Sequence, residues 1–325
     1  MRDQAAHRSP PAALWPLSQV IAAGLFVHRL EPQTGALHAL FELLATHRER
    51  SRHAAGGYLP HPGQRPLYYD DNAWVGLDQV QADLVGLSPL GSGGSWLVEA
   101  RQTLAVVLAG QDARGAVRWN DTRSSSCNTC ATAPAIELAL RLATARAELD
   151  PDVTAADVVE AARRADEALT SLLRRDDGLY ADHVTPTGAV EHSLWTYNQG
   201  TPVGADVLWY RLTGDTGRLD RASATATAAL THFGAEALWR EPPAFVAVMV
   251  RNLLALHAVR PVPGLLDVLD GYLERAWETG RDGHDGRFGG GGMGRYDDGG
   301  AIDHGAVVQL LALRCWPAAW WPDIC

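Results

Sequence analysis

The stretch "DPDVTAADVVEAARRADEALTSLLRR", residues 150–175, decides the fold class of this chain. Its apolar side chains recur every three or four residues, at Val158, Ala162, Ala165, Leu169 and Leu172, which places them on one face of an α-helix. Three further stretches show similar spacing: "PAIELALRLATARAEL", "GRLDRASATATAALTHF" and "AFVAVMVRNLLALHAV". Extended along the chain, the pattern gives roughly ten to twelve helices, and alternating strand patterns are not evident. The sequence therefore predicts an all-α fold.

Long loops separate these helical patterns and share a composition. The segments "DARGAVRWND", "DDGLYADHVTPTG" and "DGHDGRFGGGGMGRYDDGG" each combine Asp-Gly turns with an aromatic residue. Each follows one helical pattern and precedes another, so helix pairs repeating around a ring would gather these loops at one end. No Pro/Ser linker or break in composition marks a boundary, and we therefore expect residues 1–325 to form a single domain.

The charge pattern excludes several kinds of partner and chemistry. The formal net charge is −10, which argues against binding to nucleic acid or to an anionic membrane surface. All 28 of the Lys and Arg residues are arginines, which excludes a lysine Schiff base and a lysine-based phosphate loop. No apolar run reaches the roughly 18 to 20 residues of a membrane span. We expect no cofactor.

The N-terminal region contains "AALWPLSQVIAAGLFV", residues 12–27, which loosely resembles the apolar part of a signal peptide. Pro16, Ser18 and Gln19 interrupt it, so we expect a first amphipathic helix instead. The 4 cysteines in 325 residues do not make a disulfide framework. We expect a cytoplasmic location, with secretion as the alternative.

Two adjacent carboxylates stand out in "PLYYDDNAWVGLDQV", residues 66–80. In a helix that includes Asp70, successive side chains diverge by about 100°, so Asp70 and Asp71 would point toward different parts of a bound ligand. Aromatic residues on both sides offer surfaces on which sugar rings stack, and burial beside them can raise the pKa of one carboxyl group while its neighbour stays ionised. The alternative is that Asp70 caps the helix and that Asp71 is a first-turn acid favoured by the helix dipole.

The pair belongs to a series of five motifs, which are "YYDDNAW", "RWND", "CNTCATAPAIELALRL", "WTYNQGTPVGADVLWYRLTGD" and "FVAVMVRNLLAL". In this order they resemble the motifs of glycoside hydrolase family 76, the α-1,6-mannanases, from about residue 66 to residue 258. The resemblance implies an (α/α)6 barrel of six inner and six outer helices around a cleft. It also implies endo-hydrolysis of α-1,6-linked mannose chains with retention of configuration, in which Asp70 resembles the nucleophile and Asp71 the acid/base.

The same motifs supply the candidate residues for sugar binding. Tyr197 can stack on a sugar, and the amides of Asn198 and Gln199 can donate and accept hydrogen bonds at once; a helix start capped by Asn198 is the alternative. Trp119 is either a stacking platform or a core residue, and Arg251 either contacts substrate or forms a structural ion pair. The remaining candidates are Tyr69, Asn72, Trp74, Asn128 and Thr129, with loop capping as the alternative for the last two.

Other features leave alternatives open. Val246 stands where a lysine is common in the family, which puts the exact substrate in question. The alternatives to hydrolysis are a transglycosidase on α-mannosides, a carbohydrate-binding barrel without hydrolase activity and a sugar epimerase.

Cys127 and Cys130 form an isolated C-x-x-C, interpreted as incidental thiols, and His183 is interpreted as a surface or supporting residue. We predict no metal site, and the expected partner is α-mannan or a manno-oligosaccharide, in an oligomeric state that the sequence leaves open.

Overall fold

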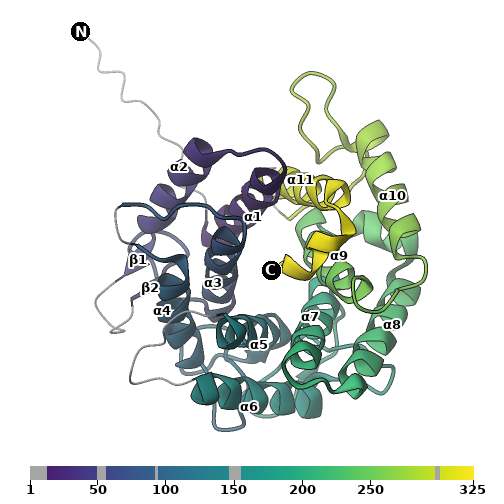
Figure 1. The fold of residues 1–325 in the computed structure, drawn as a ribbon. Coiled ribbons are helices and arrows are strands. Elements are labelled where there is room, and N and C mark those ends of the chain that lie inside the picture. The colour runs from purple at the N-terminus through teal and green to yellow at the C-terminus, as the bar shows by residue number, and fades with distance from the viewer. Residues whose placement is uncertain (1–12, 50–55, 92–93, 146–154, 297–300) are drawn as a thin grey trace.

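The computed structural model describes residues 13–49, 56–91, 94–145, 155–296 and 301–325. Eleven α-helices in these residues form a closed ring of two layers (Figure 1). The odd-numbered helices form the inner layer: α1 (Leu14–Leu30), α3 (Tyr69–Leu84), α5 (Thr129–Thr144), α7 (Thr196–Thr213), α9 (Pro243–His257) and α11 (Ala301–Cys315). The even-numbered helices lie outside them: α2 (Thr34–Ala45), α4 (Trp96–Leu108), α6 (Ala155–Leu173), α8 (Thr216–Arg240) and α10 (Leu265–Arg275).

The order of helices around the ring follows the chain. Each inner helix packs against the next inner helix, and α11 closes the ring against α1. The predicted all-α class and the (α/α)6 barrel are confirmed. Five outer helices, rather than the expected six, occur in the described residues, because α11 is followed by a short 3₁₀ helix, Ala318–Asp323.

The two layers differ in how their helices are buried. On α6 the residues Val158, Ala162, Ala165 and Leu169 are buried, Leu172 is half-buried and the opposite face is exposed, as the apolar spacing predicts. Helix α9 is buried along nearly its whole length and on all sides. A helix that is apolar all round must be covered on every side, which explains why α9 lies in the inner layer.

Close packing between inner helices depends on glycine. A Cβ atom added to Gly200 in α7 would lie 2.4 Å from Met249 Cα and 2.9 Å from Val248 O, both in the backbone of α9. Real side chains do not tolerate such distances, so only glycine lets α7 and α9 approach this closely. The glycine of the "WTYNQG" motif therefore accommodates a neighbouring helix.

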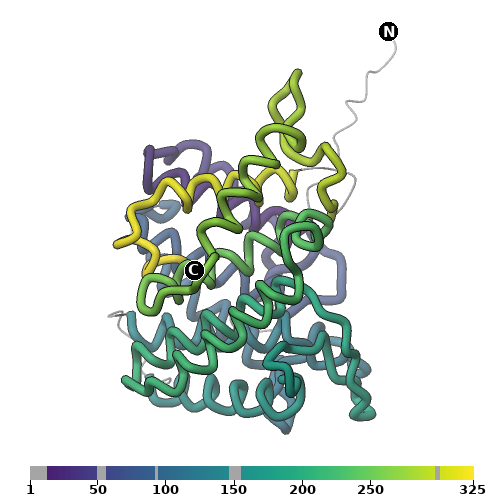
Figure 2. The backbone as a smooth tube through the Cα atoms, turned by 90° about the vertical axis from the view of Figure 1, so that its right-hand side faces the viewer, coloured from purple at the N-terminus to yellow at the C-terminus, as the bar shows by residue number. Residues whose placement is uncertain are grey.

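Very short strands, which the sequence analysis did not predict, join some of the loops. Strands β1 (Arg48–Glu49) and β2 (Gly57–Tyr58) form one antiparallel pair. Strands β3 (Cys127–Asn128), β4 (His183–Val184) and β5 (Val190–Glu191) form a second antiparallel sheet. Each strand is two residues long, too short to produce an alternating pattern in the sequence. The described part of the loop between α10 and α11 projects beyond the barrel (Figure 2).

The C-terminal segment lies across one end of the barrel, near the middle of the ring in Figure 1. Arg211 Nη1 donates a hydrogen bond of 2.7 Å to the carbonyl oxygen of Pro322, and the backbone N–H of Cys325 donates one of 2.8 Å to Gln81 Oε1. Gln81 and Arg211 lie near the C-terminal ends of α3 and α7. The C-terminal segment therefore covers the end at which these two inner helices finish.

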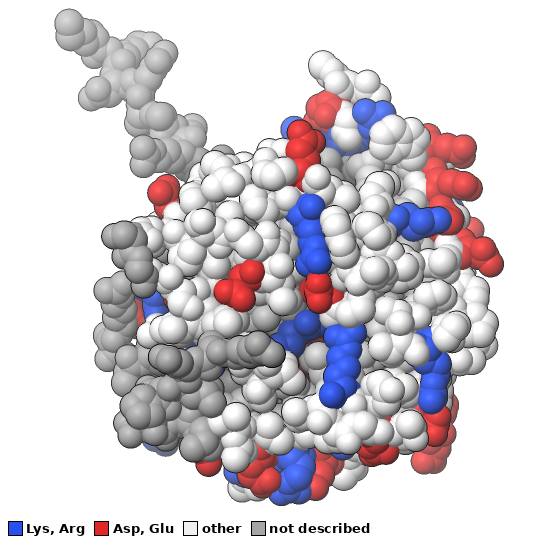
Figure 3. Space-filling model, viewed as in Figure 1, with Lys and Arg blue, Asp and Glu red and all other residues white. Residues whose placement is uncertain are grey.

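On the face seen in Figure 3, arginines and acidic side chains lie interspersed. Among the described helices, none combines the length and the apolar character needed to cross a bilayer.

The packing of α7 on α9 gives a first prediction. Gly200→Ala should destabilise the protein by about 1–3 kcal/mol, because its Cβ would overlap the backbone of α9. Gly271→Ala, in the middle of α10 with no heavy atom within 4 Å of the added Cβ, should instead stabilise it by about 0.5–1 kcal/mol. Urea unfolding followed by circular dichroism measures both changes. Equal stability of the two variants would contradict the close approach of α7 and α9.

Candidate active site

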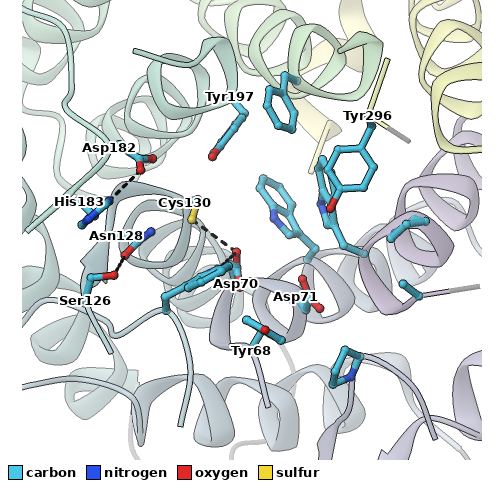
Figure 4. A pocket seen from close by; sticks show the side chains of 17 residues that line it. Tyr68, Asp70, Asp71, Ser126, Asn128, Cys130, Asp182, His183, Tyr197 and Tyr296 are labelled. Atoms are coloured by element: carbon cyan, nitrogen blue, oxygen red, sulfur yellow. Dashed lines mark hydrogen bonds and ion pairs between the residues drawn. The ribbon is translucent and has the colours of Figure 1, made fainter. Parts of the chain in front are cut away.

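A cavity of about 660 Å³ opens at the end of the barrel opposite the C-terminal segment. The first turns of α1, α3, α5, α7 and α9 contribute side chains to it, as does the segment that leads into α11 (Figure 4). The N-terminal end of a helix carries a partial positive charge, so five helix dipoles favour negative charge in this cavity. The arrangement suits carboxylates and electron-rich ligands.

The two carboxylates predicted to be functional lie together in this cavity. Helix α3 begins at Tyr69, which places Asp70 and Asp71 in its first turn, and both line the cavity. Asp70 Oδ2 accepts hydrogen bonds from Trp119 Nε1 at 3.0 Å and from Cys130 Sγ at 3.4 Å. The alternative that Asp70 caps the helix is wrong, because the capping position is Tyr68 and no side chain caps the helix there.

The environment separates the acidities of the two groups. Burial raises the pKa of Asp70 to about 6, and hydrogen bonds limit the rise, first from the backbone N–H of Asp71 and then from Cys130 and Trp119. Burial raises the pKa of Asp71 well above its ordinary value, and the charge of Asp70 raises it further. The pKa of Asp71 is therefore raised by two causes and that of Asp70 is held down by hydrogen bonds, an order that favours loss of the first proton from Asp70.

Trp119 is held over Asp70 by the backbone of its loop. The carbonyl oxygen of Trp119 accepts a hydrogen bond of 2.8 Å from the N–H of Tyr69, the first residue of α3. The ring of Trp119 also lies 4.9 Å from that of Tyr68, measured between centroids, and 39% of the residue is exposed. Trp119 is thus an exposed wall of the cavity, and the alternative of a core tryptophan is wrong.

Polar side chains line the side of the cavity beyond Asp70 (Figure 4). Strands β3 and β4 pair so that Asn128 lies opposite His183. Ser126 Oγ donates a hydrogen bond of 2.6 Å to Asn128 Oδ1. Asp182 Oδ2 lies 2.8 Å from His183 Nδ1, and Asp182 Oδ1 accepts a hydrogen bond of 3.1 Å from Asn198 Nδ2. This side offers several hydrogen-bonding groups to a ligand. Asn198 is fully buried, lies inside α7 rather than at its cap, and does not line the cavity, so its interpretation as a direct sugar contact is replaced by a role in holding Asp182.

Aromatic side chains line the other side. The rings of Trp15 and Tyr296 lie 4.6 Å apart, and those of Tyr197 and Phe245 lie 4.3 Å apart, both measured between centroids. Trp74 completes this wall next to the carboxylate pair. The cavity therefore combines a polar side and an aromatic side, with the two carboxyl groups between them (Figure 4).

Two residues of the "YYDDNAW" motif that were predicted to contact sugar do not line the cavity. Tyr69 is 3% exposed, and its ring packs on Gly110. Asn72 is fully buried; its Oδ1 accepts a hydrogen bond from Tyr58 N and its Nδ2 donates to Tyr58 O. Because successive helical residues diverge, Tyr68 rather than Tyr69 reaches the cavity. The interpretation of Tyr69 and Asn72 as direct sugar contacts is replaced by a role in holding α3.

Two further residues predicted to contact sugar form hydrogen bonds with the backbone and do not line the cavity. Thr129 Oγ1 donates a hydrogen bond of 2.6 Å to the carbonyl oxygen of Ala181. Gln199 Oε1 accepts from the N–H of Tyr180, and its Nε2 donates to the carbonyl oxygen of the same residue. Both side chains are fully buried. They fix the loop that carries Asp182, and the interpretation as direct sugar contacts is replaced by this supporting role.

Arg251 and Val246 lie below the cavity in the core. Arg251 is 2% exposed, and its guanidinium carbon lies 4.7 Å from the centroid of the Trp74 ring. The buried carboxyl groups of Glu137 and Asp78 attract it, so it supports the floor beneath Trp74 and does not line the cavity. Val246 is 1% exposed and packs in the apolar core. The difference at Val246 therefore changes the core and not the cavity lining.

Several lining residues were not predicted. His183, interpreted as a surface or supporting residue, faces the cavity beside Asp182, and Cys130, interpreted as an incidental thiol, contacts Asp70. The signal available for Asp182 was its place in one of the Asp-Gly loops expected at a common end of the ring. Tyr296 lies in another of these loops and had the same signal, whereas Trp15, in the first turn of α1, carried none.

The barrel, with paired carboxyl groups in an aromatic-walled cavity, has the features of a glycoside hydrolase. The model of glycosyl hydrolase family 76 matches residues 5–287, and the chain belongs to this family. This confirms the resemblance drawn from the sequence motifs.

Solved structures of this fold give the same picture. An α-mannanase of Bacteroides thetaiotaomicron is 19% identical with a TM-score of 0.79, over 94% of this chain and 86% of that one. An α-1,6-mannanase of Salegentibacter sp. HEL1_6 is 18% identical with a TM-score of 0.73, over 93% and 88%. An inactive variant of that mannanase in complex with α-1,6-mannotriose is 17% identical with a TM-score of 0.71, over 93% and 89%. No curated protein matches the chain. At these identities the structures establish a shared fold.

The interaction between the two carboxyl groups gives a second prediction. In Asp70→Asn the pKa of Asp71 should fall, because the substitution removes the neighbouring negative charge that raises it. Carbon-13 NMR of aspartate-labelled protein follows the titration of Asp71 directly. Asp267→Asn, an exposed position on α10, is the matched control and should leave that titration unchanged. An unchanged titration in Asp70→Asn as well would show that the two carboxyl groups do not interact.

Proposed function

We propose that this protein is a retaining glycosidase that hydrolyses α-1,6-mannosidic linkages. The observation that carries the proposal is the pair of adjacent carboxyl groups in one cavity, where the pKa of Asp70 is raised to about 6 and the pKa of Asp71 is raised well above its ordinary value. A retaining glycosidase needs one ionised carboxylate and one carboxylic acid at the scissile bond. Membership of glycosyl hydrolase family 76 and the mannotriose bound by a relative support mannose as the substrate sugar.

The proposed reaction has two steps. First, the Asp70 carboxylate attacks the anomeric carbon, the glycosidic C–O bond breaks, and Asp71 gives its proton to the leaving oxygen. This forms a glycosyl ester on Asp70 and leaves Asp71 ionised. Second, Asp71 takes a proton from water, the water oxygen bonds to the anomeric carbon, and the ester bond breaks. Both carboxyl groups return to their initial states, and two inversions leave the product in the α configuration.

The two sides of the cavity suit an uncharged sugar chain. Ser126, Asn128 and Asp182 offer donors and acceptors for hydroxyl groups. Trp15, Phe245 and the other aromatic rings offer faces on which neighbouring sugars stack. Among the described residues that line the cavity there is no arginine, and a sugar carrying a carboxylate or phosphate would meet acidic groups without a guanidinium partner. Neutral mannose fits this lining better than an acidic sugar.

Product analysis gives a third prediction and tests the proposal. The purified protein should release products from α-1,6-linked manno-oligosaccharides, and proton NMR should detect the α-anomer first. Asp70→Asn and Asp71→Asn should each lower kcat/KM by about 10²- to 10⁴-fold, because each removes a group that acts in the transition state. Asp267→Asn, on the exposed face of α10, should keep wild-type activity.

The outcomes of this assay separate the alternatives. Initial formation of the β-anomer would contradict the retaining mechanism. Binding of manno-oligosaccharides without turnover would favour a carbohydrate-binding barrel, and longer oligosaccharides as the main products would favour a transglycosidase.

The pH dependence of kcat/KM gives a fourth prediction. Activity should rise on the acid side as Asp70 loses its proton near pH 6 and should fall at higher pH as Asp71 loses its proton. Trp119→Phe removes a hydrogen-bond donor to the Asp70 carboxylate, so the acid limb of kcat/KM should move to higher pH by about one unit. A shift of this size corresponds to the loss of one hydrogen bond to a charged group, worth about 1.5 kcal/mol. A limb that stays in place or moves to lower pH would contradict the assignment of Asp70 as the ionised group.

A further inference from the structure

One thiol group lies directly against the proposed nucleophile. Cys130 is the second residue of α5; it is 6% exposed and lines the cavity. Its Sγ lies 3.4 Å from Asp70 Oδ2, a distance that a hydrogen bond from sulfur allows (Figure 4). The mechanism proposed above assigns no task to this side chain.

The surroundings of Cys130 keep its proton in place. Burial raises the pKa of the thiol well above its ordinary value, and the carboxyl groups of Asp70, Asp182 and Asp71 raise it further. The phenol of Tyr197, from α7, also interacts with it. Burial and the carboxyl groups of Asp70 and Asp182 disfavour a thiolate, so Cys130 stays an S–H group in the range where Asp70 titrates. It can therefore donate a hydrogen bond but is a poor nucleophile or base.

The thiol shares its acceptor with a second donor. Asp70 Oδ2 receives both the Trp119 N–H at 3.0 Å and the Cys130 S–H, while Oδ1 is buried and has no side-chain hydrogen-bond partner among the described residues. Trp119 comes from a loop and Cys130 from α5, so the two donors approach the oxygen from different elements. Two donors on one oxygen fix the rotation of the carboxylate and favour its charged form.

We propose that Cys130 is a positioning residue, whose S–H group orients the Asp70 carboxylate and helps to keep it ionised for attack. The proposal rests on the function proposed above for Asp70. Trp119 and Cys130 together hold one oxygen of the carboxylate, and the neighbouring carboxyl groups prevent the thiol from becoming a competing anion. The thiol neither reacts nor loses its proton.

The other cysteine of the C-x-x-C provides a matched control. Cys127 Sγ lies 3.5 Å from Asp112 Oδ2 and 3.7 Å from Arg114 Nη2, and Cys127 does not line the cavity. It is buried like Cys130 and lies three residues earlier in the chain. Replacing Cys127 removes a buried thiol of the same region without removing a donor to Asp70.

Activity profiles of the variants test the proposal as a fifth prediction. In Cys130→Ala the acid limb of kcat/KM should move to higher pH by about half a unit, which lowers kcat/KM on the acid side about threefold. Cys130→Ser keeps a donor and should keep the limb near its wild-type position, and Cys127→Ala should not move it. Equal shifts in Cys130→Ala and Cys130→Ser, or no shift in either, would overturn the proposal.

A second readout needs no substrate. The infrared S–H stretching band of Cys130, assigned by its loss in Cys130→Ala, should move to higher frequency when Asp70 becomes protonated below about pH 6, because the acceptor weakens. The same band should be insensitive to that pH change in Asp70→Asn. A band that does not respond in the wild type would overturn the hydrogen bond itself. Since this measurement does not depend on mannoside turnover, it separates failure of the positioning role from failure of the proposed activity.

Discussion

The constraint on which the structure depends is the common direction of the inner helices. Five of these helices direct their first turns at one cavity, so the partial positive charges of their N-termini converge there. The apolar faces of the helices fill the space below, and Gly200 lets α7 and α9 pack closely. Polar side chains are therefore concentrated at one end of the barrel, where the loops can supply further groups. The site is a consequence of how the barrel is packed.

Within this cavity, unequal hydrogen bonding distinguishes two otherwise identical side chains. Asp70 receives hydrogen bonds from Trp119 and Cys130, which offset part of the cost of burying its charge. Burial and the charge of Asp70 raise the pKa of Asp71 well above its ordinary value. Adjacent residues on a helix point in different directions, so each carboxyl group has its own surroundings. The division into an ionised and a protonated group follows from these neighbours rather than from the residue type.

The sequence predicted features whose signal is local. The spacing of Val158, Ala162, Ala165 and Leu169 predicted α6, and the Asp70–Asp71 pair was predicted as the centre of the site. The predicted residues Trp74, Trp119, Asn128 and Tyr197 also line the cavity. Motif membership alone did not distinguish side chains that face the cavity from those that hold backbone, as at Tyr69, Asn72, Thr129 and Gln199. The pairing that brings Asn128 beside His183 on the polar side was beyond prediction, because β3 and β4 are two residues long and far apart in the chain.

The central claim is that Asp70 attacks the anomeric carbon of a mannoside. The most direct test is to incubate the protein with a fluorinated mannosyl fluoride, which slows release of a glycosyl-enzyme, and to locate the label by peptide mass mapping. The account predicts one mannosyl group attached to Asp70, with no label formed in Asp70→Asn. A label on another residue, or turnover of the reagent in the wild type with no covalent intermediate, would contradict it.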